Sequence, residues 1–114
     1  MARAVWNGIV LAEADETTVV DGYHYFSAET VRWEHLAEST RTSVCGWKGT
    51  ARYWDVVADG SVNPAAAWSY EDPKPAARPI RGWVGFWHGV HIERNGDEDE
   101  RSGWLARMRR KVAG

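Results

Sequence analysis

The sequence contains a single cysteine, Cys45, among its 114 residues. One cysteine excludes an internal disulfide and any metal site that needs several thiolates. Because disulfides are typical of secreted proteins, this scarcity favours a cytoplasmic protein. The first residues, MARAVWNG, also lack the apolar core of a signal peptide, which favours the same location.

Long hydrophobic runs and an excess of one charge are also missing. No apolar run approaches the ~20 residues of a membrane span, so we expect no membrane partner. The net charge of -2 disfavours nucleic acid as a partner. The sequence indicates no cofactor and leaves the oligomeric state open. The 44% of hydrophobic residues suits a globular domain with its own core.

Short β-branched or aromatic segments alternate with the turn dipeptides Asn7-Gly8, Asp21-Gly22 and Asp59-Gly60. Asn-Gly and Asp-Gly are strong hairpin signals because both residues accept positive φ. We expect strands near 2–6, 9–13, 17–20, 23–26, 52–58 and 80–88. This spacing predicts a mostly β protein of small antiparallel sheets, β-tent-like or barrel-like.

Two helices are expected in addition to the strands. Ser27 can cap a short internal helix over 28–36, followed by a polar connection at 38–42. The acidic run NGDEDE at 95–100 then reads as a linker to a basic helix at 102–111. We therefore divide the chain into a β domain, 1–94, and a linker with a C-terminal helix or tail, 95–114. The tail either docks on the domain, frays, or meets an acidic partner.

The stretch 43–57, SVCGWKGTARYWDVV, combines a turn with a strand. Gly46 and Gly49 bracket Trp47-Lys48, so the backbone can turn tightly there or approach a ligand closely. Cys45 and Lys48 are candidate catalytic residues, because a nearby cation favours the reactive thiolate. The alternative is a buried, inert thiol.

Tryptophan is unusually frequent, with eight in the chain. On a strand over 80–88, Trp83 and Trp87 share one face with Arg81, and the indoles lie about 13 Å apart. A neighbouring Trp47, Trp54 or Trp68 could complete an aromatic cage, which binds planar rings or cations. Lys48 and Arg81 could orient a polar group of the ligand. Alternatively, these rings simply fill the core. The candidate ligand-binding residues are Trp47, Lys48, Trp54, Trp68, Tyr70, Arg81, Trp83 and Trp87.

Metal-dependent chemistry has little support. Asp55 and Asp59 share a strand face but lie roughly 13 Å apart, too far to hold one magnesium ion. His88 and His91 would point to opposite faces of a strand unless Gly89 interrupts it. No metal site is predicted.

Several motifs together resemble the DUF427 family of uncharacterised bacterial domains, which carries a nucleotidyltransferase-like label. The matching segments are WNG at 6–8, HYF at 24–26, SVC at 43–45, WKG at 47–49, AWSY at 67–70, DPKP at 72–75 and 82–86. Glu29, Val31 and Tyr53 also match, and the resemblance covers about 2–93. The family usually has proline where this chain has Gly46, and prolines where it has Ser27 and Ala28.

This resemblance implies a small antiparallel β domain and suggests similarity to the β-tent group. Some members of that group bind zinc through paired CxxC motifs, which one cysteine cannot provide. Others hold a small ligand in a tryptophan cage. Our first hypothesis is therefore a small-ligand-binding module with a tryptophan-lined pocket for a planar or cationic, nucleoside-like molecule. The alternatives are an enzyme using Cys45 and Lys48, possibly on nucleotides, and a protein-interaction domain.

Overall fold

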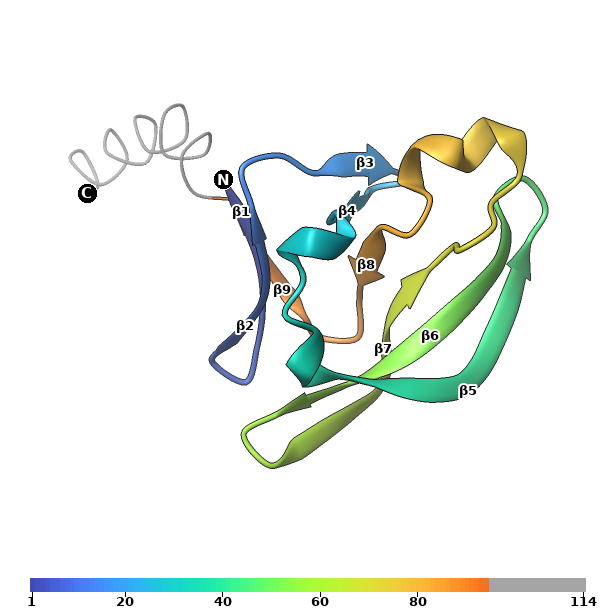
Figure 1. Cartoon of the computed structure of the whole chain (residues 1–114). Coiled ribbons are helices and arrows are strands. Elements are labelled where there is room, and N and C mark those ends of the chain that lie inside the picture. Colours follow the sequence, from blue (N-terminus) through green and yellow to red (C-terminus); the bar gives the residue numbers. More distant parts are fainter. Residues whose placement is uncertain (95–114) are drawn as a thin grey trace.

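A computed structural model describes residues 1–94, which form three antiparallel sheets (Figure 1). The strands are β1 Ala2–Trp6, β2 Ile9–Ala14, β3 Thr18–Val20, β4 Tyr23–Tyr25, β5 Leu36–Cys45, β6 Gly49–Ala58, β7 Ser61–Ser69, β8 Val84–Phe86 and β9 His91–Arg94. The sheets have the orders β2-β1-β9, β3-β4 and β5-β6-β7-β8. The predicted mostly β class is confirmed, with open sheets in this part of the chain and no closed barrel.

The three turn dipeptides connect paired strands, as predicted. Asn7 and Gly8 have φ values of 54° and 76°, and they join β1 to β2. The Asp-Gly pairs likewise have positive φ and join β3 to β4 and β6 to β7. Asparagine, aspartate and glycine tolerate this conformation, so local sequence determines these hairpins.

The predicted helix over 28–36 is wrong. Two separate 3-10 turns occupy the segment, η1 Ala28–Thr30 and η2 Trp33–His35. Ser27 makes no side-chain cap, and Val31 between the turns is extended, buried and bridged to Ala12. The contact with β2 therefore overrides the local helical pattern.

Two strand predictions also need correction. The polar segment 38–42 is not a connection but the middle of β5, an edge strand whose sides both reach solvent. The strand predicted over 80–88 is a strand only at β8, because Gly82 and His88 have positive φ at its two ends. Ile80 instead ends a third 3-10 segment, η3 Pro75–Ile80.

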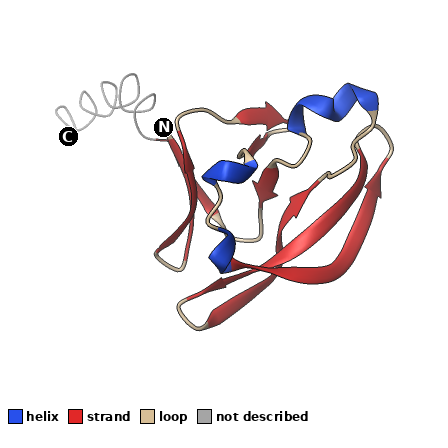
Figure 2. Ribbon diagram, in the orientation of Figure 1, coloured by secondary structure: helices blue, strands red, loops and turns tan. Residues whose placement is uncertain are grey.

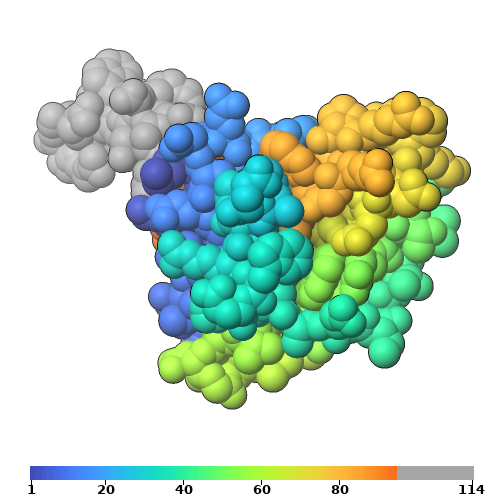
Figure 3. Space-filling view, viewed as in Figure 1, coloured from blue at the N-terminus to red at the C-terminus, as the bar shows by residue number. Residues whose placement is uncertain are grey.

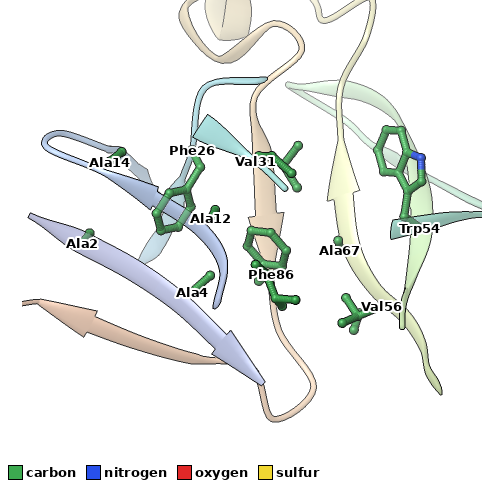
Figure 4. Close-up of a cluster of buried hydrophobic side chains, with 13 residues drawn as sticks. Ala2, Ala4, Ala12, Ala14, Phe26, Val31, Trp54, Val56, Ala67 and Phe86 are labelled. Carbon is green, nitrogen blue, oxygen red and sulfur yellow. The ribbon is translucent and has the colours of Figure 1, made fainter. Parts of the chain in front are cut away.

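The four-stranded sheet separates two hydrophobic clusters. The first lies between this sheet and the β1–β2 hairpin and includes Phe26, Val56 and Phe86 (Figure 4). The second is rich in aromatic side chains and packs on the other face. Tyr53 and Trp54, adjacent in β6, are buried in different clusters, so β6 is a central strand covered on both faces.

The segment carrying η1 and η2 links the sheets. Figure 2 shows the helical residues as short turns among the strands, and Figure 3 shows this segment filling the space between the sheets on one face. The Arg32 N–H donates to Leu11 of β2, while His35 Nδ1 lies 3.0 Å from the Val57 carbonyl of β6. No helix of residues 1–94 could span a membrane. The predicted basic helix lies outside the described residues.

Candidate functional site

Lys48 ends the turn between β5 and β6, and its side chain is buried despite its charge. The residue is 7% exposed, and its Nζ donates to Asp21 Oδ2 at 3.0 Å. The same nitrogen lies 5.4 Å from the ring centroids of Trp47 and Tyr70. Asp21 comes from the β3–β4 turn, so this ion pair joins two sheets.

The surroundings of Lys48 keep it protonated. Burial alone would lower its pKa, but the Asp21 hydrogen bond and the Tyr25 and Tyr70 hydroxyls outweigh that effect and raise the pKa. Burial raises the pKa of Tyr70, although the Lys48 charge opposes this. The site therefore presents an ammonium group beside the Tyr70 phenol.

Cys45 lies three residues before this ammonium, at the end of β5. The backbone N–H of Trp47 is the largest influence on its thiol and lowers the pKa. Partial burial opposes the shift, whereas the Lys48 N–H and ammonium reinforce it, and the net pKa is lowered. We call Cys45, Trp47, Lys48 and Tyr70 the thiol–lysine site.

A neighbouring loop holds the turn in place. The Lys74 N–H donates to the Lys48 carbonyl at 2.9 Å, and Lys74 Nζ donates to the Gly46 carbonyl at 2.7 Å. At Gly49, with φ of 114°, an added Cβ would lie 3.5 Å from the Asp72 carbonyl oxygen. That distance is an ordinary contact, so the positive φ, rather than lack of space, is the reason for glycine at this position.

A second group of side chains forms an aromatic wall, which we define as Tyr53, Trp68 and Trp87. Tyr53 and Trp87 are stacked, with centroids 6.1 Å apart and planes inclined by 28°. Trp68 meets Trp87 edge-on at 5.3 Å. Tyr53 and Trp68 are each 6% exposed, whereas Trp87 is half-buried. Tyr23, which is exposed, meets Trp68 edge-on at 5.0 Å and forms the rim.

Polar contacts orient the rings of the wall. The Trp87 indole N–H donates to the Ala65 carbonyl at 2.7 Å, and the Tyr53 hydroxyl lies 2.8 Å from Ser43 Oγ. The Trp68 indole N–H donates to the Tyr25 hydroxyl at 3.1 Å. Since the Tyr25 hydroxyl also raises the Lys48 pKa, it connects the wall to the thiol–lysine site.

A cation from the protein itself lies against the wall. The Arg41 guanidinium carbon is 4.8 Å from the Tyr53 centroid and 5.7 Å from the Trp87 centroid. Both distances are within the range of cation–π attraction. The wall is therefore arranged so that a planar cation can contact two of its rings.

The residues predicted from the sequence divide between several places. Trp68 and Trp87 lie in the wall, and Trp83 packs on the same cluster. Trp54 lies on the opposite face of the sheet, where it meets Trp33 at 5.2 Å and Arg52 at 4.6 Å. It is therefore not part of the wall. Arg81 is exposed beside Tyr70, to which a β-bridge links its backbone.

Sequence reasoning missed Asp21, Tyr25, Arg41 and Tyr53 as members of these sites. Asp21 was assigned only to a turn, and Tyr25 only to a strand. Their partners lie 27 and 43 residues away, respectively, so no local spacing signals the contacts. Arg41 lies in a segment predicted as a connection. Tyr53 is the one residue with a signal in the sequence, because alternation along the strand predicted over 52–58 places Tyr53 and Trp54 on opposite faces.

An open groove of about 550 Å³ is lined by Gly49, Thr50, Arg52, Glu71, Asp72 and Lys74. No group of three or more His, Cys, Asp or Glu side chains in residues 1–94 is placed to hold a metal ion. His88 stacks on Trp87 at 4.1 Å.

One family model matches residues 1–97, and its description is a domain of unknown function, DUF427. No curated protein matches the sequence. The match covers every residue of both sites.

Proposed function

This chain belongs to the DUF427 family, a domain of unknown function, and we propose that it is a binding module for a small planar or cationic ligand, such as a nucleoside-like molecule. The observation that supports this most is the meeting of Tyr53, Trp68 and Trp87. Rings from β6, from β7 and from the residue after β8 form one wall with Tyr23 at its exposed rim. Aromatic walls bind planar rings by stacking and cations through the ring quadrupole.

The polar groups beside the wall suit such a ligand. Lys48 and Asp21 place opposite charges next to each other. The Tyr25 hydroxyl accepts a hydrogen bond from the Trp68 indole and also raises the pKa of Lys48. A stacked ligand with donor or acceptor groups could therefore be oriented at this end of the wall. The proposal includes a cytoplasmic setting, which the single cysteine favours.

The test is a titration of tryptophan fluorescence and a thermal-shift assay with nucleosides, nucleotides, cyclic imides and quaternary amines. A ligand that quenches fluorescence and raises the melting temperature supports the proposal. Trp87→Leu should then weaken binding five- to 150-fold, because loss of one stacking ring costs about 1–3 kcal/mol.

Trp33→Leu is the matched control. Trp33 also donates its indole N–H to an alanine carbonyl and packs edge-on against another tryptophan, but on the opposite face of the sheet. Trp33→Leu should therefore leave the affinity for the ligand unchanged. If both variants bind like the wild type, or if no compound binds the wild type, the module proposal fails.

A second candidate is an enzyme that uses Cys45 as a nucleophile beside Lys48, possibly on nucleotides. The lowered pKa of Cys45, caused first by the Trp47 N–H, favours this candidate. It is tested by the rate of iodoacetamide alkylation between pH 5 and 10. A titration midpoint clearly below that of free cysteine, about 8.5, supports it, and an ordinary midpoint with slow alkylation at pH 7 rejects it.

A further inference from the structure

The aromatic wall holds a guanidinium group in the described structure, and that group is Arg41. Its contacts with Tyr53 and Trp87 resemble those that a bound planar cation would make. No carboxylate of residues 1–94 forms an ion pair with Arg41, whereas Arg3, Arg32 and Arg52 all have such partners in this range. The rings are therefore the principal partner of the Arg41 charge.

The backbone that carries Arg41 is a bulge in β5. Glu38 pairs with Trp54 and Thr42 pairs with Arg52, so three residues of β5 oppose Tyr53 alone. Within this bulge the Arg41 N–H donates to Ser39 Oγ rather than to β6. Because β5 has only β6 as a neighbour in its sheet, Arg41 could leave the wall without breaking a second strand ladder.

We infer that the ligand of the aromatic wall is a planar cation that takes the place of Arg41. This inference rests on the function proposed above and narrows it to one class of ligand. Tyr53 is almost fully buried and Arg41 lies over its ring, so a ligand reaches the ring only when Arg41 moves. An incoming cation restores the attraction that is lost, whereas a neutral ring does not.

The experiment compares N-methylpyridinium and N-methylguanidinium with their neutral counterparts toluene and N-methylurea. Each probe is titrated into the wild-type chain and into Arg41→Ala, with tryptophan fluorescence as the readout. Removing the competing side chain should raise the affinity for the two cations two- to fivefold, which equals about 0.4–1 kcal/mol. The neutral probes should bind more weakly than the cations to both proteins.

Arg52→Ala is the matched control, since Arg52 lies 4.6 Å from the Trp54 centroid on the other face of the sheet. It removes the same charge and the same kind of contact but should leave cation affinity unchanged.

A second measurement uses the wild-type chain alone. In NMR spectra, the Arg41 Nε–H resonance should move toward its random-coil position as N-methylpyridinium is added, because it leaves the ring currents.

The outcomes separate this inference from the proposed function. Tighter cation binding by Arg41→Ala, together with displacement of the Arg41 resonance, supports both. If neutral probes bind as well as cations, or if Arg41→Ala binds cations no better than the wild type, the inference is overturned and the module remains. If no planar compound binds either protein, both proposals fail.

Discussion

At the scale of one residue, Gly85 shows how closely the backbone of β8 approaches the aromatic wall. A Cβ at this position would lie 2.7 Å from Cζ2 of Trp68. Trp68 cannot easily move, because its indole N–H is bonded to Tyr25 and its ring meets Trp87. Gly85→Ala should therefore lower the free energy of unfolding by about 1–3 kcal/mol in urea denaturation. Gly46→Ala is the control, because a Cβ at that position meets nothing within 4 Å. Its free energy of unfolding should differ from that of the wild type by no more than about 0.5 kcal/mol.

The Cys45 thiol offers a second prediction at this scale, because two neighbouring charges act on it in opposite directions. Lys48→Met removes a cation that lowers the Cys45 pKa, so the midpoint of its alkylation profile should move to higher pH. Asp21→Asn removes an anion that raises the same pKa, so the midpoint should move to lower pH. If the midpoint moved in the same direction in both variants, Lys48 and Asp21 would not act on Cys45 through their charges.

At the scale of elements, both neighbours of β6 carry bulges. In β7, Asn63 pairs with Val56 and Ala67 with Trp54, so residues 64–66 all oppose Asp55. The Asp55 Oδ1 accepts a hydrogen bond from the Ala65 N–H at 2.8 Å, where Ala65 has a positive φ of 51°. The Asp55 side chain thus provides an acceptor for one backbone N–H that the bulge removes from the ladder.

Asp55→Ala should leave the Ala65 N–H without its acceptor and lower the free energy of unfolding by about 1–2 kcal/mol. Because Ala65 also accepts the Trp87 indole N–H, the tryptophan emission of the folded protein should change as well. Asp55→Asn keeps an acceptor and should retain more than half of the lost stability. Equal losses in the two variants would contradict the hydrogen-bond argument.

The elements also show what the sequence could and could not predict. Hairpins closed by Asn-Gly or Asp-Gly were predictable, because positive φ at two adjacent residues is a local property. The helix expected over 28–36 is absent, and the sequence could not show this, because Val31 is held extended by Ala12 of β2, 19 positions earlier in the chain. The long strand over 80–88 failed because periodicity does not reveal the positive φ of His88. In the candidate site, the Lys48–Asp21 and Arg41–Tyr53 contacts depend on strand pairing and a bulge, neither of which has a spacing signal.

At the scale of the whole molecule, His24 joins the small β3–β4 sheet to β9. Its Nδ1 lies 2.7 Å from Thr17 Oγ1, and its Nε2 lies 3.4 Å from Arg94. Burial lowers the pKa of His24, and the Arg94 charge adds to this shift. The unfolded chain therefore binds a proton more readily than the folded one. The stability contributed by neutral His24 should be complete above about pH 6.5 and decline as the pH falls below that value.

Urea denaturation between pH 7.5 and 5 measures this effect when the wild type is compared with His24→Gln. Other groups titrate in both proteins, so the difference between the two curves reports on His24. The wild type should lose more stability than the variant as the pH falls. Parallel curves would show that His24 titrates alike in the folded and unfolded chains.

The pairing of β9 with β1 has a consequence for how the protein is made. Ala2 pairs with Arg94 and Val5 with His91, so the first sheet joins the earliest and latest strands of the described chain. During synthesis, the β1–β2 hairpin leaves the ribosome with the β1 edge unpaired, and this edge stays open until residue 94 emerges, several seconds later at about 5–20 residues per second. Such sequence separation slows folding, and an unpaired edge invites strands from other chains. The β1 edge is therefore open to pairing with other chains throughout the synthesis of the residues between β2 and β9.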